Sequence, residues 1–127
     1  MIIARIKTAT PAGTRIPKPQ STGAYEVLRW SWSRDEEALV YHIPPKAGTT
    51  RASEKRLTTS AFRAAFEVLT QSGSITRRWF AAAFPELDAD GGCNFTTLGG
   101  VFVLIGEAHY GGRGVYRKAT GCQSPQG

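Results

Sequence analysis

Four side chains in the sequence are of the types that bind zinc: Cys93, Cys122, His42 and His109. Structural zinc sites place their cysteines and histidines in closely spaced pairs, because each pair must reach one tetrahedral ion. None of these four residues has such a neighbour in the chain. Packed thiols and surface imidazoles are the simpler interpretation. We therefore predict no metal site, no disulfide scaffold and no cofactor.

The segment Glu86-x-Asp88-x-Asp90-Gly91 has the spacing of the start of a calcium-binding EF-hand loop. Such a loop closes on a bidentate glutamate, and the sequence has Thr97 at that position. The coordination sphere is incomplete, so we predict a solvated loop in which Asp90 or Asn94 caps the helix that follows.

Signatures of catalysis are missing from the sequence. Gly111, Gly112 and Gly114 do not lie between a strand and a helix, so they form neither a dinucleotide fingerprint nor a phosphate loop. No Ser-His-Asp order, nucleophile elbow or pair of active-site carboxylates is recognisable. The acidic run at 35–37 is more simply the tip of a hairpin. We predict that the protein is not an enzyme.

Basic residues are in excess, with a formal net charge of +6 at pH 7. Such an excess favours polyanionic partners, because lysines and arginines that contact phosphates release counterions. Residues 1–56 hold ten basic and five acidic side chains, whereas residues 57–127 hold six basic and five acidic ones. Most of the excess therefore precedes residue 57.

Aromatic residues are concentrated at 25–41. Strand alternation places Trp30 and Trp32 on one face, and Tyr25 and Tyr41 on the other. Aromatic side chains interleaved with arginines can stack on bases. Two tryptophans on the same face are more often part of the core against a helix layer, and we favour that interpretation.

The chain of 127 residues fits a single α+β domain. Residues 1–24 are rich in proline, glycine and basic residues, and predict a basic arm or loop. Residues 25–45 predict a β-hairpin that ends at a Pro-Pro pair, and residues 46–56 predict a second loop. No stretch has the length or composition of a membrane span or a secretory signal, so we expect a cytoplasmic protein without membrane contact.

Residues 57–119 change to helical periodicity. One helix is predicted at about 60–71 with Gly73 as its C-cap, and a second follows the N-cap candidate Ser74 and stops at Pro85. A third helix is predicted from about Asn94 to residue 105, although its apolar run 101–105 is also compatible with a buried strand. A glycine-turned hairpin follows at 108–118, and residues 120–127 read as a polar tail. The expected helical core consists of Phe62, Phe66, Leu69, Trp79, Phe80, Phe95, Leu98, Phe102 and Ile105.

Three short helices followed by a hairpin resemble the winged helix-turn-helix superfamily, which is best known for DNA binding. The resemblance implies that the helix after Asn94 is the recognition helix and that the hairpin is the wing. Together with the basic loop at 46–56, it implies nucleic-acid contacts from Arg51, Lys55, Arg56, Arg77, Arg78, Thr96, Thr97, Arg113, Arg117 and Lys118.

The implied recognition helix lacks the side chains that usually read bases. Its expected outer face offers Thr96, Thr97, Gly100, Val103 and Leu104, whereas base edges are usually read by Arg, Lys, Asn or Gln. This composition suits contact with protein. We therefore expect a homodimer whose seam includes Gly100, Val103 and Leu104, unless the N-terminal hairpin covers this face.

Three functions remain open from the sequence. The first is non-enzymatic binding of duplex DNA through phosphate contacts, with weak sequence specificity. The second is a homodimeric protein-interaction module, and the third is a small-molecule pocket lined by the tryptophans and tyrosines.

Overall fold

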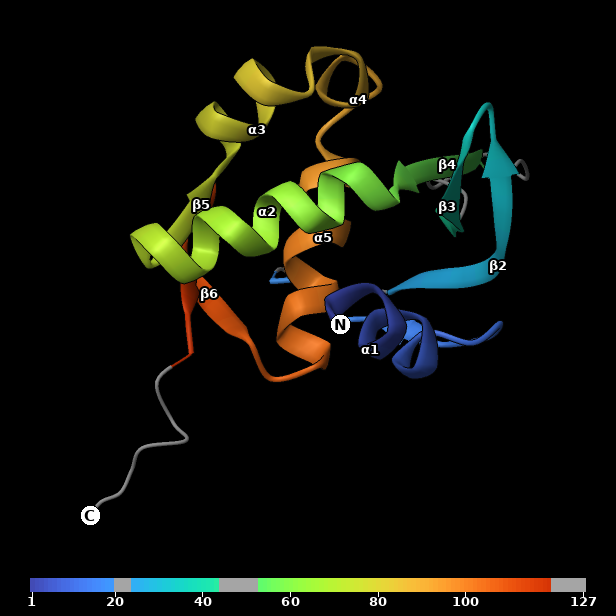
Figure 1. Cartoon of the computed structure of the whole chain (residues 1–127), viewed down its shortest axis with the longest axis horizontal. Coiled ribbons are helices and arrows are strands. Elements are labelled where there is room, and N and C mark those ends of the chain that lie inside the picture. The colour runs from blue at the N-terminus through green and yellow to red at the C-terminus, as the bar shows by residue number, and fades with distance from the viewer. Residues whose placement is uncertain (20–23, 44–52, 120–127) are drawn as a thin grey trace, which may run out of the picture.

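The computed structural model describes residues 1–19, 24–43 and 53–119, which form an α+β structure with two antiparallel sheets and five helices. The two sheets lie at opposite ends of the molecule, and helices α2 (Thr59–Ser72) and α5 (Cys93–Leu104) run between them (Figure 1). No helix in the described ranges has the length and apolar character to cross a membrane.

The first sheet contains the predicted hairpin. Its strands β2 (Tyr25–Ser33) and β3 (Glu36–Ile43) are joined by a two-residue turn, which confirms the hairpin prediction up to residue 43. The sheet also includes β1 (Arg15–Ile16) and β4 (Ser53–Thr58), in the order β1-β2-β3-β4. The predicted loop at 46–56 is therefore wrong from residue 53 onward. Strand β4 is an edge strand, and charged side chains are common on such edges because they discourage pairing with other chains.

The prediction of an irregular arm at 1–24 is also wrong in two places. Helix α1 covers Ile2–Ala9, and β1 pairs with the start of β2. Ile6 and Ile16 are fully buried, and Ile2 and Ile3 pack against the same core. A short helix with three isoleucines has little stability of its own, so burial of its apolar face stabilises it.

The second sheet is formed by β5 (Ser74–Thr76), β6 (Ala108–Gly112) and β7 (Val115–Lys118), in the order β5-β7-β6. The prediction of a two-stranded hairpin missed β5, which lies where Ser74 was expected to cap a helix. Thr76 caps α3 (Arg77–Ala83) instead, since its hydroxyl accepts from the Trp79 amide at 3.0 Å. Helix α3 ends before Pro85, as predicted. Pro85 also begins a short helix that was not predicted, α4 (Pro85–Ala89).

The helical core largely agrees with the prediction. Gly73 ends α2 in a left-handed conformation with φ of 84°, as expected for a C-cap glycine. Residues 101–104 are helical, which confirms the choice of helix over strand. Of the predicted core residues, Phe62, Leu69, Phe80, Phe95, Leu98 and Phe102 are buried, and Phe66, Trp79 and Ile105 are partly buried against them.

Candidate nucleic-acid interface

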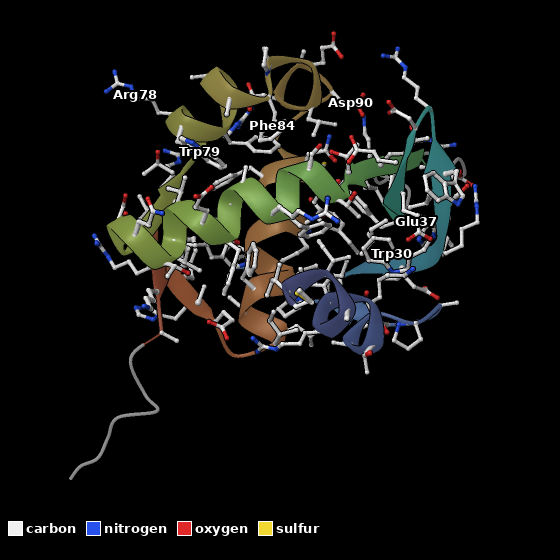
Figure 2. The ribbon with its side chains drawn as sticks, viewed as in Figure 1. Trp30, Glu37, Arg78, Trp79, Phe84 and Asp90 are labelled. Carbon is white, nitrogen blue, oxygen red and sulfur yellow. The ribbon has the colours of Figure 1, made fainter. Side chains whose placement is uncertain are left out.

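Three arginines, Arg77, Arg78 and Arg113, lie near the point where β5 passes into α3. The backbone N–H of Arg77 donates to the carbonyl of Gly114 at 2.9 Å, so the start of α3 lies against the turn between β6 and β7. Arg113 is part of that turn, and Arg78 follows Arg77 in the first turn of α3. The side chain of Arg78 points away from the body of the molecule (Figure 2).

Strand β7 adds two further cations. Arg117 is exposed and pairs with Ser74 on one side and with His109 on the other, so these three side chains share the outer face of the second sheet. The aliphatic part of the Arg117 side chain lies along Gly111, where any side chain would collide with it. Lys118 ends the strand and is exposed. We refer to Arg77, Arg78, Arg113, Arg117 and Lys118 as the basic end.

Carboxylates neutralise little of the basic end. Arg77 donates through Nε to Asp88 at 2.6 Å. Arg78, Arg113, Arg117 and Lys118 form no ion pair with any described residue. The nearby Glu107 is engaged by Arg5 at 2.8 Å. Exposed cations without such partners keep their full attraction for phosphates.

The predicted basic residues of β4 do not join this group. Lys55 and Arg56 belong to the first sheet, at the opposite end of the molecule (Figure 1). Lys55 donates to the carboxylate of Asp90 at 3.1 Å and to its carbonyl at 2.7 Å, and is thereby partly neutralised. Arg51 lies outside the described residues.

Helix α5 is not the open helix that its predicted role in recognition requires, because other parts of the chain cover much of it. Thr97 and Gly100 are buried. Of the two threonines predicted to contact DNA, only Thr96 is partly accessible. Strands β1 and β4 pack directly against α5. The outer face predicted from the helical wheel is therefore buried at Thr97 and Gly100 and only partly open at Thr96, Val103 and Leu104.

The predicted dimer seam is wrong at Gly100. A methyl group at this position would lie 2.5 Å from the carbonyl oxygen of Pro17 and 2.7 Å from Cγ2 of Ile16, so β1 and its extension fill the space expected for a second copy. Val103 is half-buried, and Leu104 is 38% exposed at the end of the helix. Dimerisation through Val103 and Leu104 remains a prediction.

A small cavity of about 390 Å³ opens within the basic end. Its walls include Arg77 and Arg113 together with three aromatic rings, those of Phe95, Tyr110 and Tyr116. Burial and the nearby Tyr110 raise the pKa of Tyr116 to about 12, so its hydroxyl is protonated at neutral pH. This site was not predicted from the sequence, although Tyr110 and Tyr116 flank the glycine turn and pair directly across it.

The tryptophans and tyrosines at 25–41 do not line a common pocket in the described structure. Tyr25 and Tyr41 are buried with ring centroids 5.5 Å apart, Trp30 packs on Phe62, and Trp32 is 68% exposed. A register shift between Val27 and Arg29 interrupts the strand alternation. Trp30 therefore points toward the same core as Tyr25, contrary to the prediction.

A second cavity, of about 670 Å³, lies beside the tip of the β2–β3 hairpin and helix α4, and its lining includes Phe84 and Asp90, which Figure 2 labels. Its lining is mixed in charge and includes Arg34, Glu36 and Arg56. Glu36 is already engaged, because its carboxylate accepts from the Ser60 amide and from the Thr59 and Ser60 hydroxyls at 2.8–2.9 Å. This carboxylate stabilises the start of α2, so we assign Glu36 a structural role rather than a role in ligand binding.

Neither candidate metal site is assembled in the described ranges. The carboxylate of Asp88 accepts from Arg77, and that of Asp90 accepts from Lys55. Residues 85–89 are helical, so the predicted solvated loop is wrong there. His42 and His109 belong to different sheets, and Cys122 lies outside the described residues. No group of three potential ligands occurs among the residues that the structure describes. Asn94, the predicted cap, is buried instead, accepting from the Tyr41 hydroxyl at 2.6 Å.

Comparison of the chain with protein-family models, with curated proteins and with solved structures finds no match. The function must therefore be argued from the site alone.

Proposed function

We propose that this protein is a non-enzymatic nucleic-acid-binding protein that contacts the phosphates of duplex DNA through its basic end. The observation that supports this proposal most strongly is the grouping of four exposed, unpaired cations, Arg78, Arg113, Arg117 and Lys118, on adjoining elements in the described structure. Phosphate contacts from such residues supply most of the sequence-independent affinity for DNA.

The order of elements supports a winged-helix-like arrangement for residues 57–119. Helices α2, α3 and α5 precede the β6–β7 hairpin, and the hairpin lies beside the start of α3 through its pairing with β5. Two features depart from that arrangement: α4 is inserted before α5, and the first sheet covers α5.

The covered helix defines the mode of binding that we propose. With α5 covered, the helix expected to read bases does not present its predicted face to a major groove. Arginines and lysines on phosphates position a protein but carry no base information. Binding should therefore be nearly independent of DNA sequence.

The test is fluorescence anisotropy with a short random-sequence duplex over a series of salt concentrations. In the wild type, the logarithm of the affinity should fall linearly with the logarithm of the salt concentration. Reversing both Arg113 and Arg117 to glutamate should lower the slope by about 2, because each lost phosphate contact removes about 0.9.

The matched control reverses Arg15 and Arg56 to glutamate, which changes the net charge equally on the first sheet. This control should retain most of the slope. Equal losses in both double variants would show that total charge matters rather than the basic end, and absence of DNA binding at low salt would refute the proposal.

Sedimentation equilibrium tests the alternative function, that of a homodimeric protein-interaction module. It would gain support from a dimer that Leu104→Glu dissociates, since Leu104 is an exposed large apolar side chain at the end of α5.

A further inference from the structure

The cavity of about 670 Å³ lies along the open edge of strand β4. Its lining includes Glu54, Lys55, Arg56 and Thr58 of this strand, and residues 83–87 from the end of α3 into α4. Strand β4 is the last strand of the first sheet and pairs only with β3 among the described residues. The cavity is therefore a groove with a strand edge on one side and α4 on another.

The strand register shows which backbone groups of β4 face the open edge. Ser33 and Glu36 flank the two-residue turn between β2 and β3, so they form a hydrogen-bonded pair. Such pairs alternate along an antiparallel ladder, so successive residues of β3 bond in turn to β2 and to β4. This alternation directs the N–H and C=O groups of Glu54 and Arg56 away from β3. No other described segment forms a backbone hydrogen bond to them, so they are available to an added strand.

The charges of β4 favour an acidic partner strand. Charged side chains on an edge discourage pairing, but two of the three on β4 are already neutralised. Glu54 is engaged by Arg29 at 3.1 Å, and Lys55 by Asp90 at 3.1 Å. Arg56 is exposed and forms no ion pair with any described residue. An acidic residue directly opposite Arg56 would complement this charge.

Helix α4 provides an apolar wall on the other face of the strand. Lys55 and Leu57 share one face of β4, and Lys55 donates to Asp90 at the end of α4, so the helix lies on this face. Phe84 and Leu87 line the groove there and are partly buried. In an added strand, the two neighbours of the acidic residue point to this face, and apolar side chains suit it.

We propose that this groove binds an extended peptide segment of a partner protein. The segment adds to β4 as an antiparallel strand and places an acidic residue, flanked by two apolar residues, opposite Arg56. The acids of the lining that form no ion pair with a described residue, Asp35 and Glu86, belong to the hairpin turn and to α4 rather than to β4. This inference is independent of the proposed function, because the groove lies at the first sheet and not at the basic end.

The experiment uses a peptide of sequence Thr-Val-Glu-Val-Thr, blocked at both ends. Residues 54–58 span about 14 Å, the length of five extended residues. Titrated into the ¹⁵N-labelled full-length protein, this peptide should shift the amide signals of Glu54 and Arg56 most strongly. A peptide with glutamine at the centre should bind about threefold to fivefold more weakly, the usual value of an exposed ion pair. This preference should vanish in Arg56→Gln and persist in the matched control Arg15→Gln, which removes the same charge from β1.

Methylation of the peptide backbone tests strand addition directly. A methyl group on the nitrogen of the central glutamate removes the donor that faces β4 and should weaken binding about tenfold. A methyl group on the nitrogen of the following valine, whose N–H points away from β4, should have little effect. Thermal unfolding of each protein variant checks that it is folded.

Four results would overturn the proposal. The first is no binding at millimolar peptide, and the second is equal weakening by both methylations or amide shifts centred outside residues 54–58. The third is a preference for glutamate that survives Arg56→Gln, which would place the acidic residue elsewhere. The fourth is a shift of the same amides when the protein alone is concentrated, which would assign the edge to a second copy of this chain.

Discussion

Replacing Gly99 with alanine tests how closely α5 packs against the second sheet. A methyl group at this position would overlap three atoms of the Tyr116 ring. That ring cannot swing aside, because it is 3% exposed and lies 5.6 Å, centroid to centroid, from the rings of both Phe95 and Tyr110. Either α5 or β7 must therefore move.

The expected magnitude is the difference between two effects. Overpacking in a core costs about 1–3 kcal/mol, and the upper end applies because the overlap involves a rigid ring rather than the end of a flexible chain. Alanine also favours the helix over glycine by about 1 kcal/mol. The free energy of unfolding of Gly99→Ala should thus fall by about 2 kcal/mol.

Urea unfolding followed by far-ultraviolet circular dichroism measures this change. The matched background is Tyr116→Leu, in which a smaller and more flexible side chain leaves room for the methyl group. There the penalty of Gly99→Ala should shrink toward zero. If Gly99→Ala is as stable as the wild type, or if its penalty is unchanged in the Tyr116→Leu background, the described contact between α5 and β7 is wrong.

Three further predictions concern stability. Burial raises the pKa of Glu36, but the hydrogen bonds from Ser60 and Thr59 and the charge of Arg63 outweigh it and lower the pKa overall. The ionised Glu36 carboxylate therefore stabilises the folded state at pH values above its unfolded-state pKa. This stabilisation is lost as the pH falls through its folded-state pKa. Glu36→Ala should cost about 1 kcal/mol at neutral pH and much less in acid, measured by urea unfolding at both pH values; an equal cost at both would contradict this. Gly73→Ala should lower stability by about 1 kcal/mol through its left-handed φ of 84°, and an unchanged urea midpoint would exclude that strain. Phe102→Ala should cost about 3–5 kcal/mol against a small effect of Leu104→Ala, and equal effects in thermal unfolding would mean that the faces of α5 are misassigned.

Local patterns in the sequence were sufficient for the elements that have strong signals of their own. The stripe of Phe62, Ala65 and Leu69 locates α2, Gly73 marks its end, and the glycine turn after Tyr110 locates the β6–β7 hairpin. Strands β1 and β5 and helix α1 were missed because they are short, and because β5 and α1 depend on partners far away in the chain. Strand β1 has only two residues, which pair with Glu26 and Tyr25.

The candidate site was predictable only in part. Arg77, Arg78 and Arg113 were named from the sequence, and the structure brings the start of α3 against the turn that contains Arg113 through a backbone hydrogen bond between Arg77 and Gly114. The burial of Thr97 and Gly100 could not be predicted, because the cover comes from residues about 80 positions earlier, as Gly100 and Ile16 illustrate. The inward turn of Trp30 depends on a register shift that has no marker in the sequence.

The adjacent glycines of α5 explain why an anion-binding surface would be built from short elements rather than from the central helix. Gly99 admits the ring of Tyr116 from the second sheet, and Gly100 admits Ile16 and Pro17 from the first. Successive helix positions point about 100° apart, so the two contacts hold α5 between the sheets. A helix enclosed in this way is exposed mainly near its two ends, at Gly92 and at Leu104. Under the proposed function, the cations that contact phosphates are those on the β6–β7 hairpin, which packs against α5 through Tyr116, and at the start of α3.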